Sequence, residues 1–230
     1  MEADFSFLKG MKYLGQYVYP PRPGGSIHPQ GDYYRRLLHS SEWLAQAKMN
    51  GQNTQVKINE DGTLEFFNRH HKECPYVPTE EQASFLRSLK VHAPVILNLE
   101  LLDKQTKTFK KTLYVYDVLV FRGEYLVGTS LSHRLKLLEF LFPETIPTQF
   151  KFARSPAPNV WVAQSFEAEW DELFRLYSQL DIFEGVVLKR KNGILEPGFS
   201  KENNGGWSIR CRKVKSPSRP LLSSNLSPPV

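Results

Sequence analysis

The fold depends on the stretch Trp43-Leu-Ala-Gln-Ala-Lys-Met-Asn-Gly-Gln-Asn-Thr-Gln-Val-Lys-Ile58. Apolar residues recur on the approach to Lys48, which is typical of a strand that is at least partly buried. The pair Asn50-Gly51 is a turn signal that ends this strand, and residues 54–58 begin a second one. The stretch therefore predicts a lysine held at the end of a buried strand.

Lys48 is predicted to be a nucleophile. Apolar neighbours and other cations disfavour the charged form of a lysine, and a neutral amine can attack phosphorus or carbon. The alternative is a lysine beside an ordinary Asn-Gly hairpin, with its ammonium group extended into water. The rest of the sequence decides between these two interpretations.

Further segments follow in a fixed order, and their residue types suit phosphate chemistry. They are Phe66-Phe-Asn-Arg69, Asn98-Leu-Glu100, Leu113-Tyr-Val-Tyr-Asp117, Glu184-Gly-Val-Val-Leu-Lys189 and the basic strand from Arg210 to Lys215. With Lys48-Met-Asn-Gly51, which resembles a K-x-x-G motif, this set resembles the covalent nucleotidyltransferases. These are the ATP-dependent DNA ligases, the RNA ligases and the mRNA capping enzymes. The resemblance implies an α+β ligase catalytic domain, ATP-grasp-like, with antiparallel sheets flanked by helices.

The resemblance also implies roles for individual residues. The implied catalytic residues are Lys48, Lys189, Lys213 and Lys215. The implied ATP-binding residues are Gln46, Lys48, Asn53, Arg69, Glu100, Tyr116, Glu184, Lys189 and Lys213. Tyr116 would stack on the purine, and Glu100 and Glu184 would hold Mg²⁺ or Mn²⁺. Independently, a carboxylate on a strand as apolar as that of Glu100 is costly unless it meets a hydroxyl, a metal or a cation.

Positive charge is concentrated near the C-terminal end. The net charge is +6, and residues 189–219 contain nine basic and two acidic residues, whereas the remainder is close to neutral. Such a segment suits a phosphate-binding face. The predicted nucleic-acid-binding residues are Arg69, Arg190, Lys191, Arg210 and Arg212. For the last strand, residue type favours Lys213 and Lys215 as the K-x-K element, whereas the distance from Trp207 favours Arg210 and Arg212.

Length and composition bound the organisation of the chain. Of the 230 residues, 1–30 are expected to form an irregular lead-in, 31–215 the nucleotidyltransferase domain, and 216–230 a disordered tail rich in proline and serine. The residues after Lys215 are too few for an oligonucleotide-binding (OB) barrel, so no C-terminal OB domain is expected, and a protein partner could replace it. Neither a membrane span nor a signal peptide is indicated, which predicts a cytoplasmic protein. Cys74 and Cys211 suggest no disulfide framework or zinc site.

Hydrophobic periodicity predicts the remaining elements. Helices are expected over residues 32–41, 79–90, 131–141 and 167–179, the first with Tyr33, Leu37 and Leu38 on its apolar face. Strands are expected over 93–102, 112–121, 159–164, 182–189 and 206–215.

The predicted activity is ATP-dependent sealing of 5′-phosphate and 3′-hydroxyl ends through a lysyl-AMP intermediate. An RNA ligase is favoured, because Asn50 and Asn53 depart from the K-x-D-G-x-R pattern of DNA ligases and match phage-type RNA-repair ligases. A DNA ligase acting on nicks is the alternative, since Tyr116-Asp-Val-Leu119 resembles that class. A non-catalytic domain that binds nucleic-acid ends and a capping guanylyltransferase that uses GTP are the other two alternatives.

Overall fold

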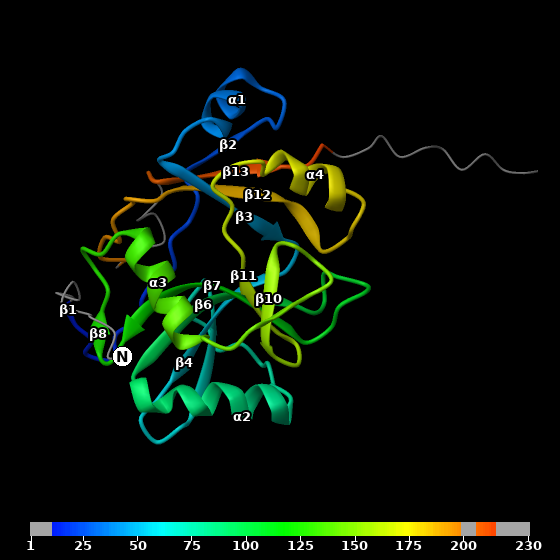
Figure 1. Ribbon diagram of the computed structural model, residues 1–230. Coiled ribbons are helices and arrows are strands. Elements are labelled where there is room, and N and C mark those ends of the chain that lie inside the picture. Colours follow the sequence, from blue (N-terminus) through cyan, green and yellow to red (C-terminus); the bar gives the residue numbers. More distant parts are fainter. Residues whose placement is uncertain (1–10, 199–205, 215–230) are drawn as a thin grey trace, which may run out of the picture.

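The protein is built from two β-sheets with helices on their outer sides (Figure 1). The computed structural model describes residues 11–198 and 206–214. Within these ranges there are four α-helices, together with one short 3-10 helix at Leu89–His92. None of the described helices is long and apolar enough to cross a membrane.

The larger sheet contains nine strands in the part of the chain that is described. Its main path runs through β5 (Leu64–Asn68), β4 (Gln52–Ile58), β6 (Val95–Leu102), β7 (Thr112–Phe121), β11 (Val160–Ala163), β10 (Ala153–Ala157) and β9 (Ile146–Pro147). Beside β7 lie β8 (Glu124–Tyr125) and then β1 (Met11–Lys12). The predicted hairpin of β4 and β5 is present, with Val56 opposite Phe66.

The smaller sheet has the order β2 (Gly25–Ile27), β13 (Ser208–Arg212), β12 (Phe183–Arg190) and β3 (Trp43–Met49). In its register, Lys48 of β3 lies opposite Gly185 of β12, and Gly185 lies opposite Arg212 of β13. The smaller sheet therefore brings the segments that contain Lys48, Glu184 and Arg212 side by side.

The sheets are mixed, which corrects the expectation of antiparallel sheets. β11 pairs with β7 in parallel, with Trp161 opposite Tyr114. β2 pairs with β13 in parallel, with Ser26 opposite Arg210. Both parallel pairs join segments far apart in sequence, and the spacing of strands in the sequence does not reveal such pairings.

The Asn50-Gly51 break does not close a hairpin, because β3 and β4 belong to different sheets. Gly51 is the residue at which the chain crosses over. A Cβ atom there would lie 2.6 Å from the carbonyl oxygen of Leu101 and 2.7 Å from Cγ of Glu100. Only glycine permits this close approach, so it brings the end of the Lys48 strand against the strand of Glu100.

The helices agree with the sequence pattern, with two corrections. α2 (Glu80–Ser88) begins with a capping box formed by Thr79 and Gln82, and α3 (Leu131–Leu141) has the predicted bounds. α1 (Asp32–Leu38) buries Tyr34 and Leu37, whereas Tyr33 is exposed. α4 (Asp171–Tyr177) is shorter at both ends than the expected 167–179.

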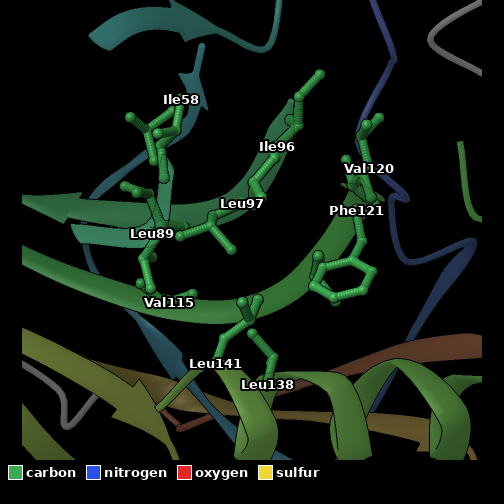
Figure 2. Close-up of a cluster of buried hydrophobic side chains, with 14 of the residues drawn as sticks. Ile58, Leu89, Ile96, Leu97, Val115, Val120, Phe121, Leu138 and Leu141 are labelled. Atoms are coloured by element: carbon green, nitrogen blue, oxygen red, sulfur yellow. The ribbon is translucent and has the colours of Figure 1, made fainter. Parts of the chain in front are cut away.

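The hydrophobic core is divided between two large clusters. One lies between the larger sheet and the helices α2 and α3, where Leu138 and Leu141 of α3 approach Val115 and Phe121 of β7 (Figure 2). The other includes Trp170 and packs the smaller sheet, α1 and α4 against residues of the larger sheet such as Leu102, Tyr114 and Trp161. This second cluster therefore holds the two sheets together.

Residues 13–24 form no helix or strand, but the N-terminal segment packs against both sheets as part of this architecture. Val18 is buried, and Gly25–Ile27 forms the edge strand β2 of the smaller sheet. A domain boundary at residue 30 would therefore separate β2 from the other strands of the smaller sheet. The predicted disordered tail, residues 216–230, lies outside the described residues.

Candidate active site

A pocket of about 500 Å³ lies between the two sheets. The smaller sheet lines it with Gln46 and Lys48 from β3, Glu184 and Lys189 from β12, and Arg210 and Arg212 from β13. The larger sheet contributes side chains from β4, β6 and β7, including Asn53, Glu100 and Tyr116. The structure thus brings most of the residues singled out in the sequence into one space.

Lys48 forms an ion pair with Glu184. Its ammonium group donates a hydrogen bond to Oε2 of Glu184, and 20% of the lysine side chain is exposed. The glutamate precedes Gly185, whose positive φ of 140° and close contact with the backbone of Cys211 admit only glycine. Nucleophilic attack by Lys48 would require its proton to leave first.

Glu100 is the second carboxylate of the pocket. Burial raises its pKa to about 7, against an opposing effect of the nearby Lys48, and the charge of Glu184 raises it further. Near neutral pH the group is therefore divided between its protonated and ionised forms. A bound cation would favour the ionised form.

Lys189 is buried at the other end of β12. Its Nζ donates a hydrogen bond of 2.6 Å to Oε1 of Gln46 and lies 4.8 Å from the centre of the Tyr116 ring. Burial lowers the pKa of Lys189 to about 8, although the carboxylate of Asp117 acts in the opposite direction. Gln46 also donates to Oγ of Ser165 at 3.1 Å, so its amide is fixed in orientation.

Two amides on the pocket wall have free hydrogen-bonding capacity. Asn53 donates hydrogen bonds to the hydroxyl of Tyr116 and to Oδ1 of Asn98. Among the described residues, Oδ1 of Asn53 and Nδ2 of Asn98 are buried without a partner. A buried acceptor and a buried donor left unpaired are costly, and a ligand hydroxyl would satisfy either of them.

Sequence reasoning missed a buried ion pair behind the pocket. Arg134 of α3 donates to both carboxylate oxygens of Asp117, at 2.9 Å and 3.3 Å, and both side chains are almost fully buried. The guanidinium also donates to the carbonyl of Thr129 and lies 5.3 Å from the Trp207 ring. The only available signal was an arginine within an otherwise apolar helical repeat.

Arginines surround the pocket. Arg69 follows β5, Arg210 and Arg212 lie on β13, and Arg22 comes from the N-terminal segment. Arg212 lies 3.8 Å from Oε2 of Glu184. Arg22 is an additional pocket residue that composition alone did not distinguish from the rest of the proline-rich segment.

Three of the predicted residues that the structure describes are not brought to the pocket. Lys213 donates to the carbonyl oxygens of Ser178 and Leu180, each at 2.8 Å, so Arg210 and Arg212 take the places favoured for the lysines. Arg190 packs over the ring of Trp43, and Lys191 pairs with Glu167 at 2.8 Å. Lys215 lies outside the described residues.

The donor set limits how a metal ion could be held. No group of three His, Cys, Asp or Glu side chains suited to a metal occurs in residues 11–198 and 206–214. Glu100 and Glu184 are two oxygen donors in one pocket. That set suits a Mg²⁺ ion which takes its other ligands from phosphate and water.

Comparisons with known proteins agree with this geometry. Residues 101–207 match the family described as the ATP dependent DNA ligase domain. A mycobacterial DNA ligase D complexed with ATP and MES has a similar structure, with a TM-score of 0.53 and 18% identity, over 85% of this chain and 60% of that one. An archaeal ATP-dependent RNA ligase is also similar, with a TM-score of 0.51 and 12% identity, over 87% of this chain and 51% of that one. No curated protein sequence matches the chain.

The two sheets and the pocket between them therefore define the class: this is the fold of a ligase adenylation domain. The matched segment includes Tyr116, Glu184 and Lys189, and the fold places Lys48 beside them. The chain thus has the fold of the adenylation domain of ATP-dependent nucleic acid ligases, and its residues 101–207 match the ATP dependent DNA ligase domain. It spans 60% or less of the length of these two solved ligases.

Proposed function

We propose that the protein is an ATP-dependent polynucleotide ligase that forms lysyl-AMP at Lys48 and seals 5′-phosphate and 3′-hydroxyl ends. The observation that carries this proposal is the pairing of Lys48 with Glu184 inside a pocket that also contains the buried Lys189. A surface lysine on a hairpin would have neither neighbour.

The proposed first step is transfer of AMP to the lysine. After its proton has left, Nζ of Lys48 forms a bond to the α-phosphorus of ATP, and the bond from that phosphorus to the pyrophosphate oxygen breaks. Lys189 supplies positive charge for the α-phosphate oxygens. Glu100 and Glu184 would hold Mg²⁺ or Mn²⁺, which supplies Lewis-acid neutralisation of the phosphate charge when bound.

The nucleoside would be held by the deeper part of the pocket. Gln46 would contact the base and Tyr116 would stack on it. The unpaired Oδ1 of Asn53 and Nδ2 of Asn98 are complementary to a sugar hydroxyl, which can both donate and accept. This complementarity supports a nucleoside as the ligand. The second and third steps would pass AMP to a 5′-phosphate and then release it when the 3′-hydroxyl attacks.

The nucleic acid is proposed to be RNA, with nicked DNA as the second candidate. Asn53 in place of an arginine favours RNA, whereas the family match of residues 101–207 favours DNA. We also propose that a further domain or a protein partner helps to clamp the nucleic acid, and that the protein is cytoplasmic.

The decisive experiment is covalent labelling. The protein is incubated with α-labelled ATP or GTP and Mg²⁺, and acid-stable label on the protein is measured for the wild type and Lys48→Ala. Label from ATP that is lost in the variant supports a ligase. Label from GTP alone would support a capping enzyme, and no label from either would leave a binding domain. Sealing assays on nicked RNA and nicked DNA then identify the substrate.

A further inference from the structure

Residues 18–24 form a strap that crosses from one sheet to the other at the edge of the pocket. At its first end, Gln55 of β4 donates a hydrogen bond of 2.6 Å to the carbonyl oxygen of Val18. At its second end, the amide of Gly24 donates to the carbonyl oxygen of Ser208 of β13 at 3.0 Å. The strap is therefore held by the larger sheet at one end and by the smaller sheet at the other.

The strap is stiff between these ends. Its central residues are Pro20, Pro21, Arg22 and Pro23, and each proline fixes its own φ angle. Residues that precede a proline are also restricted to extended conformations, which applies to Arg22. Arg22 lines the pocket and remains exposed, so its guanidinium is presented at the mouth with little freedom of the backbone.

Arg22 has no ion-pair partner among the described residues, unlike Lys48 and Arg212, which both face Glu184. Lys189 is buried below the mouth. An exposed arginine without a carboxylate partner at the mouth of a pocket is available to a phosphate group from outside the pocket.

We propose that Arg22 binds a backbone phosphate of the polynucleotide substrate, and that the strap is part of the nucleic-acid-binding surface of the proposed ligase. The inference rests on the proposed function for the identity of the polynucleotide. Three other arginines line the same pocket, and Arg210 is tied to the end of the strap through a hydrogen bond of 3.4 Å from its Nε to the carbonyl of Gly25. Arg69 and Arg210 add to the positive charge of the same pocket.

The test compares Arg22→Gln, Arg22→Lys and the matched control Arg154→Gln in the full chain. Arg154 is an exposed arginine of β10 that does not line the pocket. Binding of a fluorescent nicked DNA duplex and a nicked RNA duplex is measured over a range of salt concentrations. Arg22→Gln is expected to weaken binding about three- to tenfold, and to reduce the slope of log K against log salt by about one. Arg22→Lys should recover most of the slope, and Arg154→Gln should match the wild type.

Labelling of Lys48 by ATP, measured in parallel, separates the possible failures. If Arg22→Gln raises the KM for ATP in labelling and leaves duplex binding unchanged, Arg22 binds the triphosphate and the inference is wrong. Equal losses in the Arg22 and Arg154 variants, or no binding of either duplex by the wild type, also overturn it. If the wild type binds duplex through Arg22 and shows no label, the proposed ligase chemistry fails and the phosphate contact stands.

Discussion

Lys48 and Glu184 are 136 residues apart in the sequence and form an ion pair across neighbouring strands of the smaller sheet. The contact orients the amine of Lys48. The carboxylate belongs to the residue immediately before Gly185, whose φ is positive. The pair joins the first segment of the motif set to the segment Glu184–Lys189.

Removing the carboxylate of this pair is expected to reduce labelling strongly. In Glu184→Gln the amine loses its ionic partner, and the pocket loses the charge of one of the two carboxylates proposed to hold a metal. We expect the rate of lysyl-AMP formation at saturating ATP to fall by at least about 10-fold. Glu172→Gln, which removes an exposed carboxylate on α4, is the control. An unchanged rate in Glu184→Gln would rule out a part for the pair in the first step.

Replacing Lys189 tests the role of the buried cation. Lys189→Met keeps most of the side-chain volume and removes the charge, so labelling is expected to fall about 100-fold or more. The variant also leaves Oε1 of Gln46 without its donor, which costs about 1–3 kcal/mol of stability. Urea denaturation measures that cost separately. Lys136→Met, on the exposed side of α3, should change neither quantity.

The raised pKa of Glu100 predicts how the stability of the folded protein varies with pH. This pKa is about 7 in the folded protein and 4.5 in an unconstrained chain, so between these values the folded state binds more protons than the unfolded state. The contribution of this group is therefore greatest below about pH 4.5 and is lost as pH rises to about 7. The loss is at most about 3 kcal/mol. Urea denaturation across this range should show a flatter profile for Glu100→Gln, whereas Glu60→Gln, on an exposed turn, should keep the wild-type profile.

Gly51 should tolerate no side chain. In Gly51→Ala the new methyl group meets the carbonyl of Leu101 at 2.6 Å, so the junction of the two sheets must shift. We expect a loss of about 1–3 kcal/mol in the free energy of unfolding, together with slower labelling. Gly25→Ala is the control, because nothing lies within 4 Å of a Cβ at that position. If both variants behave alike, the crossing does not depend on close approach at residue 51.

The buried Asp117–Arg134 pair should show strong coupling. Arg134→Met leaves a buried carboxylate without its partner and is expected to cost about 3–5 kcal/mol. The double variant Asp117→Leu with Arg134→Met removes both charges and should recover part of that loss. A double-mutant cycle in urea measures the coupling. Additive effects would show that the two side chains act independently.

Periodic segments were predictable, and contacts between distant segments were not. The bounds of strand 112–121 and helix 131–141 were correct because alternation and helical spacing are strong in both segments. At Asn50-Gly51 the sequence carries the usual hairpin signal, yet contacts with β6 and β12 override it.

In the candidate site, too, local sequence patterns were informative and contacts between distant segments were not. Glu100 and Lys189 were recognisable because charged residues on buried strands require a partner or a ligand. Lys213 was placed wrongly because residue type does not determine the register of a strand, and the carbonyls of Ser178 and Leu180 capture its side chain. Arg22 was overlooked because neither the pairing of β2 with β13 nor the path of residues 18–24 leaves a periodic pattern in the sequence.

The crossing of the chain at Gly51 puts Lys48, the proposed nucleophile, beside the shortest covalent link between the two sheets among the described residues. If the halves rotate relative to each other, atoms next to this link travel least and atoms far from it travel farthest. An AMP group attached to Lys48 would then keep its place at the pivot while the outer rim exchanges one substrate for the next.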